Sequence, residues 1–189
     1  MLMHRSQEER REATTQALLA AGRRLFGARG YAGVSSAAVA AAAGLTTGAM
    51  YHHFEDKAAL FRSVFTSVEA ELAAAVRRAA AVPGDPIVRL EKGALAFLEA
   101  AREPPVRRIV LIDGPSVLGW ERWRFIDEKH HLRPLKAALI VAMRAGLMER
   151  RDPDTLARLL MGALTEAALD GGREIANSAL WLISRLRRT

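Results

Sequence analysis

The 189-residue sequence contains no cysteine. Without thiols, the chain has no disulfide scaffold, no thiolate zinc site and no cysteine nucleophile. Lysine is also scarce, because only four of the 28 basic residues are lysine and no lysine-rich tail concentrates the net charge of +7. This dispersed positive charge permits binding to nucleic acid but does not by itself indicate it. Half of the residues are apolar and 26% are charged, as expected for a folded chain.

Residues 30–54 contain no aspartate, glutamate, lysine or arginine. They do not predict a membrane span, because four glycines interrupt them and most of their apolar residues are alanine. Residues 1–10 are too charged for the apolar core of a secretory signal. We therefore expect a cytoplasmic protein without a membrane partner.

Sequence motifs of common enzymes are missing as well. The sequence has no Walker motif, no Gly-x-Ser-x-Gly and no His-Glu-x-x-His, and the glycines at 27, 30 and 33 lack the spacing of a dinucleotide-binding loop. One Glu-x-x-His occurs at residues 128–131, whereas di-iron bundles need two copies and two further glutamates. We expect no enzyme and no cofactor, and a metal protein built on Asp127, Glu128 and His131 is the less favoured alternative.

Apolar residues recur with a period of 3.6 almost throughout, and no segment alternates as a half-buried strand does. This pattern predicts an all-α fold, in which an N-terminal three-helix helix-turn-helix domain precedes a C-terminal helical bundle. We expect Ser35 or Ser36, Thr46, Asp56 and Asp85 to cap helix N-termini. About nine helices are predicted, over residues 7–27, 36–43, 46–53, 57–81, 86–101, 103–113, 120–145 with a kink at Pro134, 153–170 and 173–187.

Residues 36–43 and 46–53 predict two short helices joined by Gly44 and Leu45, which is the arrangement of a helix-turn-helix. The second helix begins with small and polar residues. Such an end fits the major groove of DNA, which is about 12 Å wide. The sequence therefore indicates a DNA-binding element near the N-terminus.

Four segments at their observed spacing resemble the DNA-binding domain of the tetracycline-repressor (TetR) family: Leu25-Phe26-Gly-Ala-Arg-Gly30-Tyr31, Val34-Ser-Ser, Ala42-Ala-Gly44-Leu45 and Met50-Tyr51-His-His-Phe54-Glu-Asp-Lys57-Ala-Ala-Leu60. The resemblance covers about the first 65 residues. It implies a DNA-binding domain over residues 8–65 and a helical ligand-binding and dimerisation domain over residues 66–189. It also implies DNA contacts by Ser35, Ser36, Thr46, Thr47, Gly48, Ala49, Tyr51, His52 and Lys57.

The predicted recognition helix contains no arginine, although arginine to guanine is the commonest specific base contact. Base readout would then depend on threonine, tyrosine and histidine, on methyl contacts to thymine and on DNA shape. We expect an N-terminal arm around Arg5 to contribute. Two structural alternatives stay open, in which Tyr51 packs against its neighbours and Lys57 is only solvated.

Aromatic and charged residues mix within residues 113–131, as in pockets for small molecules. Further lining residues are predicted from their helix faces. The predicted effector pocket consists of Phe97, Asp113, Trp120, Trp123, Arg124, Asp127, His131, Met143, Met161 and Thr165. The alternative is that one tryptophan fills the core and the charges form solvent-exposed pairs.

The last two predicted helices carry apolar stripes with small residues, which suits a two-fold dimer interface. The predicted interface consists of Leu156, Leu160, Ala163, Leu164, Ala167, Ala176, Ala179, Leu180, Ile183 and Leu186. The sequence thus predicts a homodimeric repressor that binds a palindromic double-stranded DNA operator and is released by a small-molecule effector. An activator, or a DNA binder of the same fold that senses no ligand, is the alternative.

Overall fold

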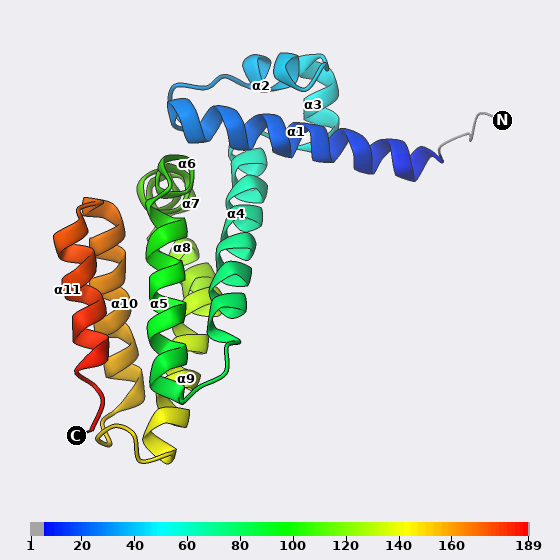
Figure 1. The fold of residues 1–189 in the computed structure, drawn as a ribbon. Coiled ribbons are helices and arrows are strands. Elements are labelled where there is room, and N and C mark those ends of the chain that lie inside the picture. The colour runs from blue at the N-terminus through cyan, green and yellow to red at the C-terminus, as the bar shows by residue number, and fades with distance from the viewer. Residues whose placement is uncertain (1–5, 189) are drawn as a thin grey trace.

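The computed structural model describes residues 6–188, which fold into helices joined by turns. Helices α1 (Gln7–Arg29), α2 (Ser36–Ala42) and α3 (Thr47–His53) form a head that lies across one end of a helical bundle (Figure 1). Helix α4 (Lys57–Ala80) begins beneath the head and runs down into the bundle. The predicted domain boundary at residues 65 and 66 therefore falls inside a continuous helix.

Local sequence determines where the first helices begin. Ser35, Thr46 and Asp56 each accept a hydrogen bond from the backbone N–H three residues later, and each precedes a helix. These contacts satisfy backbone donors that have no partner inside the helix. The predicted N-caps are confirmed, and Asp85 likewise caps α5 (Pro86–Arg102) through two backbone N–H groups.

The head has its own apolar core, in which Leu18, Val39 and Met50 are completely buried. Phe26 and Phe61 meet edge to face at 5.3 Å between ring centroids, and Tyr31 contacts both rings. Because Phe61 belongs to α4, the core of the head includes the first turns of the helix that leads into the bundle. The short helices α2 and α3 are thus held by tertiary packing rather than by their own length.

The bundle surrounds α5, which packs against α4, α10 (Pro153–Asp170) and α11 (Arg173–Ser184). Two further rods complete it. One joins α6 (Pro104–Arg107), the π-helical segment η1 (Arg108–Asp113) and α7 (Gly114–Leu118), and the other joins α8 (Trp120–Asp127), η2 (Glu128–Leu132) and α9 (Arg133–Arg144). Counted in this way, residues 6–188 contain nine helical rods and no β-strand, which confirms the predicted all-α fold.

The predicted end of the sixth helix is wrong. The helix expected to close at residues 113–115 continues through Gly114 and Pro115 to Leu118. The π-helical turn η1 widens the backbone just before Pro115 and so makes room for a ring that would clash in a regular α-helix. Pro134 follows η2 in the same way, at the position where a kink was predicted.

The chain end also differs from the prediction, because α11 stops at Ser184 rather than at residue 187. The following residues leave the helix and pair with the loop between α9 and α10, where Met148 and Arg187 form an antiparallel bridge. None of the helices within residues 6–188 has the length and apolar character needed to cross a bilayer.

Candidate functional site

The outward face of α3 is small and polar, whereas its inward face is anchored in the core of the head. Met50 is completely buried, while Gly48, Tyr51 and His52 are exposed and Thr47 is half-buried. Thr46 uses its hydroxyl to accept the backbone N–H of Ala49, so it fixes the start of the helix. The geometry leaves Thr47, Gly48, Tyr51 and His52 free to meet a ligand from outside.

Tyr51 joins the two helices of the motif at their surface. Its phenol donates a hydrogen bond to the Ser36 hydroxyl at 3.2 Å, and the side chain stays 49% exposed. Ser35 accepts the backbone N–H of Ala38 and so caps α2. Tyr51 therefore contacts its neighbour Ser36 and stays accessible from outside, so its contact with DNA stays a prediction.

Lys57 has a definite structural role. Its ammonium donates to the carbonyl oxygens of Tyr31 and Val34, at 3.0 and 2.9 Å, and lies 4.1 Å from the centroid of the Tyr31 ring. The residue is half-buried. The alternative of a merely solvated lysine is thereby corrected, since Lys57 holds the loop between α1 and α2. Two of its three N–H groups are used in this way.

A further contact of the head was not predicted from the sequence. The hydroxyl of Thr15 and Nδ1 of His53 lie 3.1 Å apart, which connects the last turn of α3 to α1. The partners are 38 residues apart and neither belongs to a spacing motif. The sequence pattern carries no signal for such a pair.

The head is attached to the bundle through η1 and its neighbours. The Asp113 carboxylate accepts the backbone N–H of Tyr31 at 2.8 Å. A Cβ atom placed on Gly27 would lie 2.7 Å from Cβ of Pro105, so α1 and α6 meet with no space between them. Asp113, predicted in the effector pocket, lies instead at this contact between head and bundle.

Six of the ten predicted pocket residues line one cavity of about 180 Å³ between α8 and α10. Trp120 stacks on Trp123 at 5.1 Å between ring centroids. The six residues are Trp120, Trp123, Arg124, Asp127, Met161 and Thr165.

Phe97 and His131 line a second cavity, of about 140 Å³, which Met161 also borders. Its other walls are mostly apolar side chains of α4, α5, α9 and α10, with Arg77, Arg89 and His130 among them. Met143 belongs to neither cavity and lies at the far end of the bundle, in a groove beside the loop between α9 and α10. The sequence therefore predicted the walls of two adjoining cavities as one pocket.

A buried polar cluster lies beside these cavities. Nε2 of His131 lies 2.6 Å from Oε2 of Glu69, and both side chains are nearly inaccessible to solvent. Burial raises the pKa of the Asp127 carboxyl to about 6, an effect that His131 opposes and Glu69 strengthens. Glu69 was not predicted, although an acidic residue within the apolar stripe of residues 60–76 is a signal for it.

Oε1 of Glu69 has no hydrogen-bond partner within residues 6–188, although it is buried. A buried carboxylate oxygen without a partner is costly, so this atom can accept a hydrogen bond from a ligand or a water molecule. The same part of the chain holds no group of three or more histidine, aspartate and glutamate residues arranged to bind a metal ion. Nothing in the geometry therefore favours the alternative of a metal protein.

The structure places six of the predicted interface residues inside the protomer. They are buried and face α5 or each other, whereas an interface needs a face directed outward. These six are Leu160, Leu164, Ala167, Ala176, Ala179 and Ile183. Leu156, Ala163, Leu180 and Leu186 are half-buried.

The outer face of the same helix pair carries the exposed apolar side chains Leu159, Leu169, Trp181 and Leu182, which are 38–67% accessible. Apolar periodicity finds the stripe that is most regular, and in α10 and α11 that stripe packs inside the chain. The dimer interface stays a prediction, and these four side chains are the exposed apolar ones that α10 and α11 offer to it.

A helix-turn-helix head with an exposed second helix, carried on an all-helical bundle, defines the class of helix-turn-helix transcriptional regulators. Residues 18–64 match the profile described as "Bacterial regulatory proteins, tetR family", and residues 87–179 match "Tetracyclin repressor-like, C-terminal domain". The chain belongs to the TetR family of transcriptional regulators.

Individual relatives support this family assignment. A TetR-family transcriptional regulator from Pectobacterium atrosepticum is 33% identical, and its structure matches 96% of this chain and 94% of its own with a TM-score of 0.74. The HTH-type transcriptional regulator AcrR of Shigella flexneri is 32% identical over 110 residues, or 58% of this chain. The match spans about half of that curated relative, 51% of its length.

The fold is also shared with the fatty acid degradation regulator FadR of Bacillus halodurans. That structure has a TM-score of 0.77 at 15% identity and covers 97% of this chain and 96% of its own. At this identity the likeness concerns the fold alone.

Proposed function

We propose that this regulator binds a palindromic DNA operator as a homodimer and represses transcription until a small-molecule effector occupies its bundle. The observation that carries the proposal is the outward face of α3, where Thr47, Gly48, Tyr51 and His52 are free while Met50 anchors the helix from behind. The protein then acts in the cytoplasm, where its operator is, and has no enzymatic activity.

The exposed face of α3 enters the major groove. Thr47 and Ala49 offer methyl groups to thymine, Tyr51 and His52 offer hydrogen bonds to base edges or phosphates, and Gly48 lets the backbone approach closely. Around them, Ser35 and Ser36 offer hydroxyls to phosphates. Lys57 offers its third N–H to a phosphate while its other two hold the loop. Arg5 lies outside residues 6–188, so its contact stays a prediction.

The effector occupies the cavity bounded by Phe97 and His131 or the adjoining one beside Trp123. An apolar cavity of about 150 Å³ holds a molecule of the size of benzene, and the two cavities measure about 140 and 180 Å³. The fitting effector therefore has a single ring or a short apolar chain.

The contact between Asp113 and Tyr31 couples the two sites. Expansion of the cavities displaces α8 and the rod that carries η1, and η1 is bound to the end of α1 through this hydrogen bond. A shift of the head changes the spacing between the two recognition helices of a dimer. Coupling of this kind is reciprocal, so the operator must weaken effector binding by the same factor.

The outer face of α10 and α11 forms the dimer interface. It presents the exposed apolar side chains Leu159, Leu169, Trp181 and Leu182, which a partner subunit would remove from water. A two-fold axis beside these helices creates a four-helix contact and places two heads on the same side of the dimer.

The small cavity volumes favour one alternative, a DNA binder of the same fold that senses no ligand. Cavities for drug-sized ligands are commonly about 300–1,000 Å³, and both bundle cavities are smaller. An effector titration separates the two functions, because only the ligand-responsive regulator loses operator affinity as the effector is added.

In vitro selection from a random duplex library tests the DNA-binding proposal without knowledge of the operator's position. We expect enrichment of an inverted repeat whose half-sites are about one helical turn apart. Mass photometry of the complex should give two protomers on each selected duplex. A library without any enriched motif, or one protomer on an asymmetric site, would contradict the proposal.

A further inference from the structure

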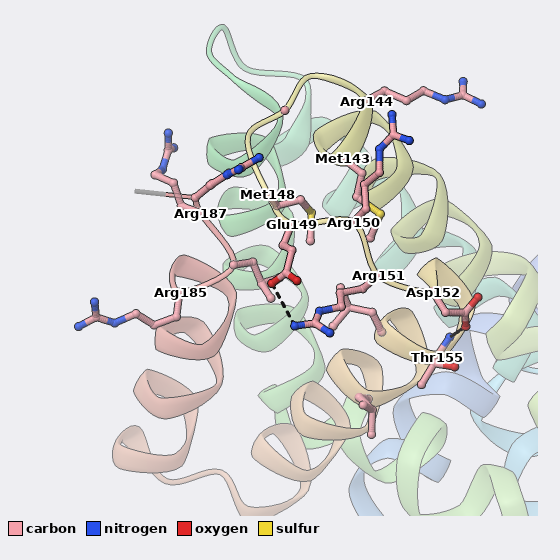
Figure 2. Close-up of a pocket in the computed structure, with 15 residues that line it drawn as sticks. Met143, Arg144, Met148, Glu149, Arg150, Arg151, Asp152, Thr155, Arg185 and Arg187 are labelled. Atoms are coloured by element: carbon pink, nitrogen blue, oxygen red, sulfur yellow. Dashed lines mark hydrogen bonds and ion pairs between the residues drawn. The ribbon is translucent and has the colours of Figure 1, made fainter.

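A wide hollow lies at the end of the bundle opposite the head (Figure 1). It is a groove of about 1,100 Å³ between the loop after α9, the first turns of α10 and the C-terminal segment (Figure 2). Arg188 donates its backbone N–H to the carbonyl of Leu147 at 2.8 Å, beside the bridge of Met148 and Arg187. Backbone pairing therefore holds these two distant segments side by side along the groove.

Arginine dominates the lining of this groove. Six arginines and two acidic residues line it, so their formal charges sum to +4. Glu149 pairs with Arg151 at 3.0 Å, and Asp85, outside the groove, pairs with Arg187 at 2.9 Å. Within residues 6–188 the remaining four form no ion pair, and they are Arg144, Arg150, Arg185 and Arg188.

These four arginines come from the end of α9, the loop after it and the C-terminal segment, and Arg185 lies 5.3 Å from the centroid of the Trp181 ring. In Figure 2, Arg144 and Arg185 extend outward at opposite sides of the groove, while Arg151 lies across its middle, where it meets Glu149. Six arginines and only two acidic residues around one hollow leave an excess of positive charge, which attracts an anion. The positive charge of the lining therefore suits an anionic ligand.

The floor of the groove is apolar. Met143 and Met148 line the groove and are buried, and Leu156 beside them is half-buried. Methionine adapts its shape to irregular apolar ligands. The occupant therefore has an apolar part as well as a negative charge.

We infer that this groove binds a small molecule that combines a phosphate group with an apolar chain. The planar guanidinium group offers paired N–H donors that match phosphate oxygens, which a lysine does not. DNA is not the occupant, because the head lies at the other end of the bundle (Figure 1). The site is separate from the cavities proposed for the effector, and it does not depend on them.

Isothermal titration calorimetry of the whole protein with octyl phosphate and with inorganic phosphate tests the inference. We expect saturable binding of octyl phosphate, about tenfold tighter than that of phosphate because part of the chain is buried. Arg150→Gln with Arg188→Gln should weaken octyl phosphate at least tenfold. The matched control, Arg122→Gln with Arg173→Gln, removes the same charge from exposed sites outside the groove and should change the affinity less than twofold.

Three outcomes would overturn the inference. One is equal binding to the wild-type protein and the Arg150 and Arg188 variant, and another is no saturation at millimolar octyl phosphate. The third is groove-dependent sedimentation with phosphatidylglycerol vesicles while free octyl phosphate fails to bind, which would assign the arginines to a lipid surface. Circular dichroism and size-exclusion chromatography of the variants check that fold and oligomeric state are retained.

Discussion

The carboxylate of Asp113 accepts the backbone N–H of Tyr31 at 2.8 Å, although 82 residues separate them. The bond joins η1, in the bundle, to the turn that follows α1 in the head. Beside it, the Lys57 ammonium binds the carbonyl oxygen of Tyr31, so both backbone polar groups of Tyr31 are held by side chains. We propose that a movement of the bundle reaches the DNA-binding helices through this turn.

Removal of the Asp113 carboxylate should loosen the head. Asp113→Ala leaves the Tyr31 N–H without its partner, and we expect a loss of about 1–2 kcal/mol in the free energy of unfolding. Hydrogen exchange at the Tyr31 amide should accelerate. Asp113→Asn is the matched control, because its amide oxygen still accepts the bond. Unchanged exchange in the alanine variant would show that Asp113 does not hold this turn.

Close approach of α1 and α6 gives a second test. Gly27→Ala places a methyl group 2.7 Å from Cβ of Pro105, and we expect a loss of about 1–3 kcal/mol from overpacking. Gly162→Ala is the control in α10, where nothing lies within 4 Å of the new methyl. That change should instead raise stability by about 0.5–1 kcal/mol. Urea denaturation measures both, and equal effects would contradict the tight contact.

Lys57→Met separates the structural role of Lys57 from its phosphate contact. Loss of two hydrogen bonds to backbone carbonyls should lower the free energy of unfolding by about 1–3 kcal/mol. If the third N–H meets a phosphate, the slope of log affinity against log salt also falls by about 0.9. DNA titrations at several salt concentrations give that slope. An unchanged slope with reduced stability would leave Lys57 a positioning residue only.

Asp127 should make stability depend on pH. Burial raises the pKa of its carboxyl to about 6, against about 3.9 in an unfolded chain. The folded state therefore binds the proton more tightly, and stability falls as the pH rises from about 4 to about 6 and is then constant.

Asp127→Asn removes this titration. The variant should gain about 1 kcal/mol over wild type at pH 7.5, a value reduced for partial solvent exposure, and little at pH 4.5. Glu121→Gln removes an exposed carboxylate from the same helix and serves as the control. Urea denaturation at the two pH values gives the difference. A gain of equal size at both would contradict the raised pKa.

Features set by neighbouring residues were predictable from the sequence. Ser35, Thr46 and Asp56 cap helices because a hydroxyl or carboxylate reaches the N–H three residues on, and this depends on little else. The aromatic and charged residues around Trp123 line a cavity, and its use as an effector pocket stays a prediction. Such signals need only the helical period and local chemistry.

Contacts between distant segments were not predictable in the same way. Lys57 binds carbonyl oxygens of the backbone, which every residue carries, so its partners leave no mark in the sequence. The apolar stripes of α10 and α11, which contain Leu160 and Ala179, have the period of a buried face. Periodicity alone does not distinguish burial against a neighbouring helix from burial against a partner subunit. Asp113 lies in the segment that was predicted to line the effector pocket. It contacts the head instead, and this position depends on the continuation of the helix through Pro115.

The central claim is that the exposed face of α3 binds DNA, and fluorescence anisotropy with the selected duplex tests it most directly. Thr47→Glu puts a negative charge on that face, and Thr66→Glu puts the same charge on an exposed position of α4. We predict at least a tenfold loss of affinity, about 1.4 kcal/mol, for the first variant and little change for the second. Equal affinity of both variants and the wild-type protein would contradict the account.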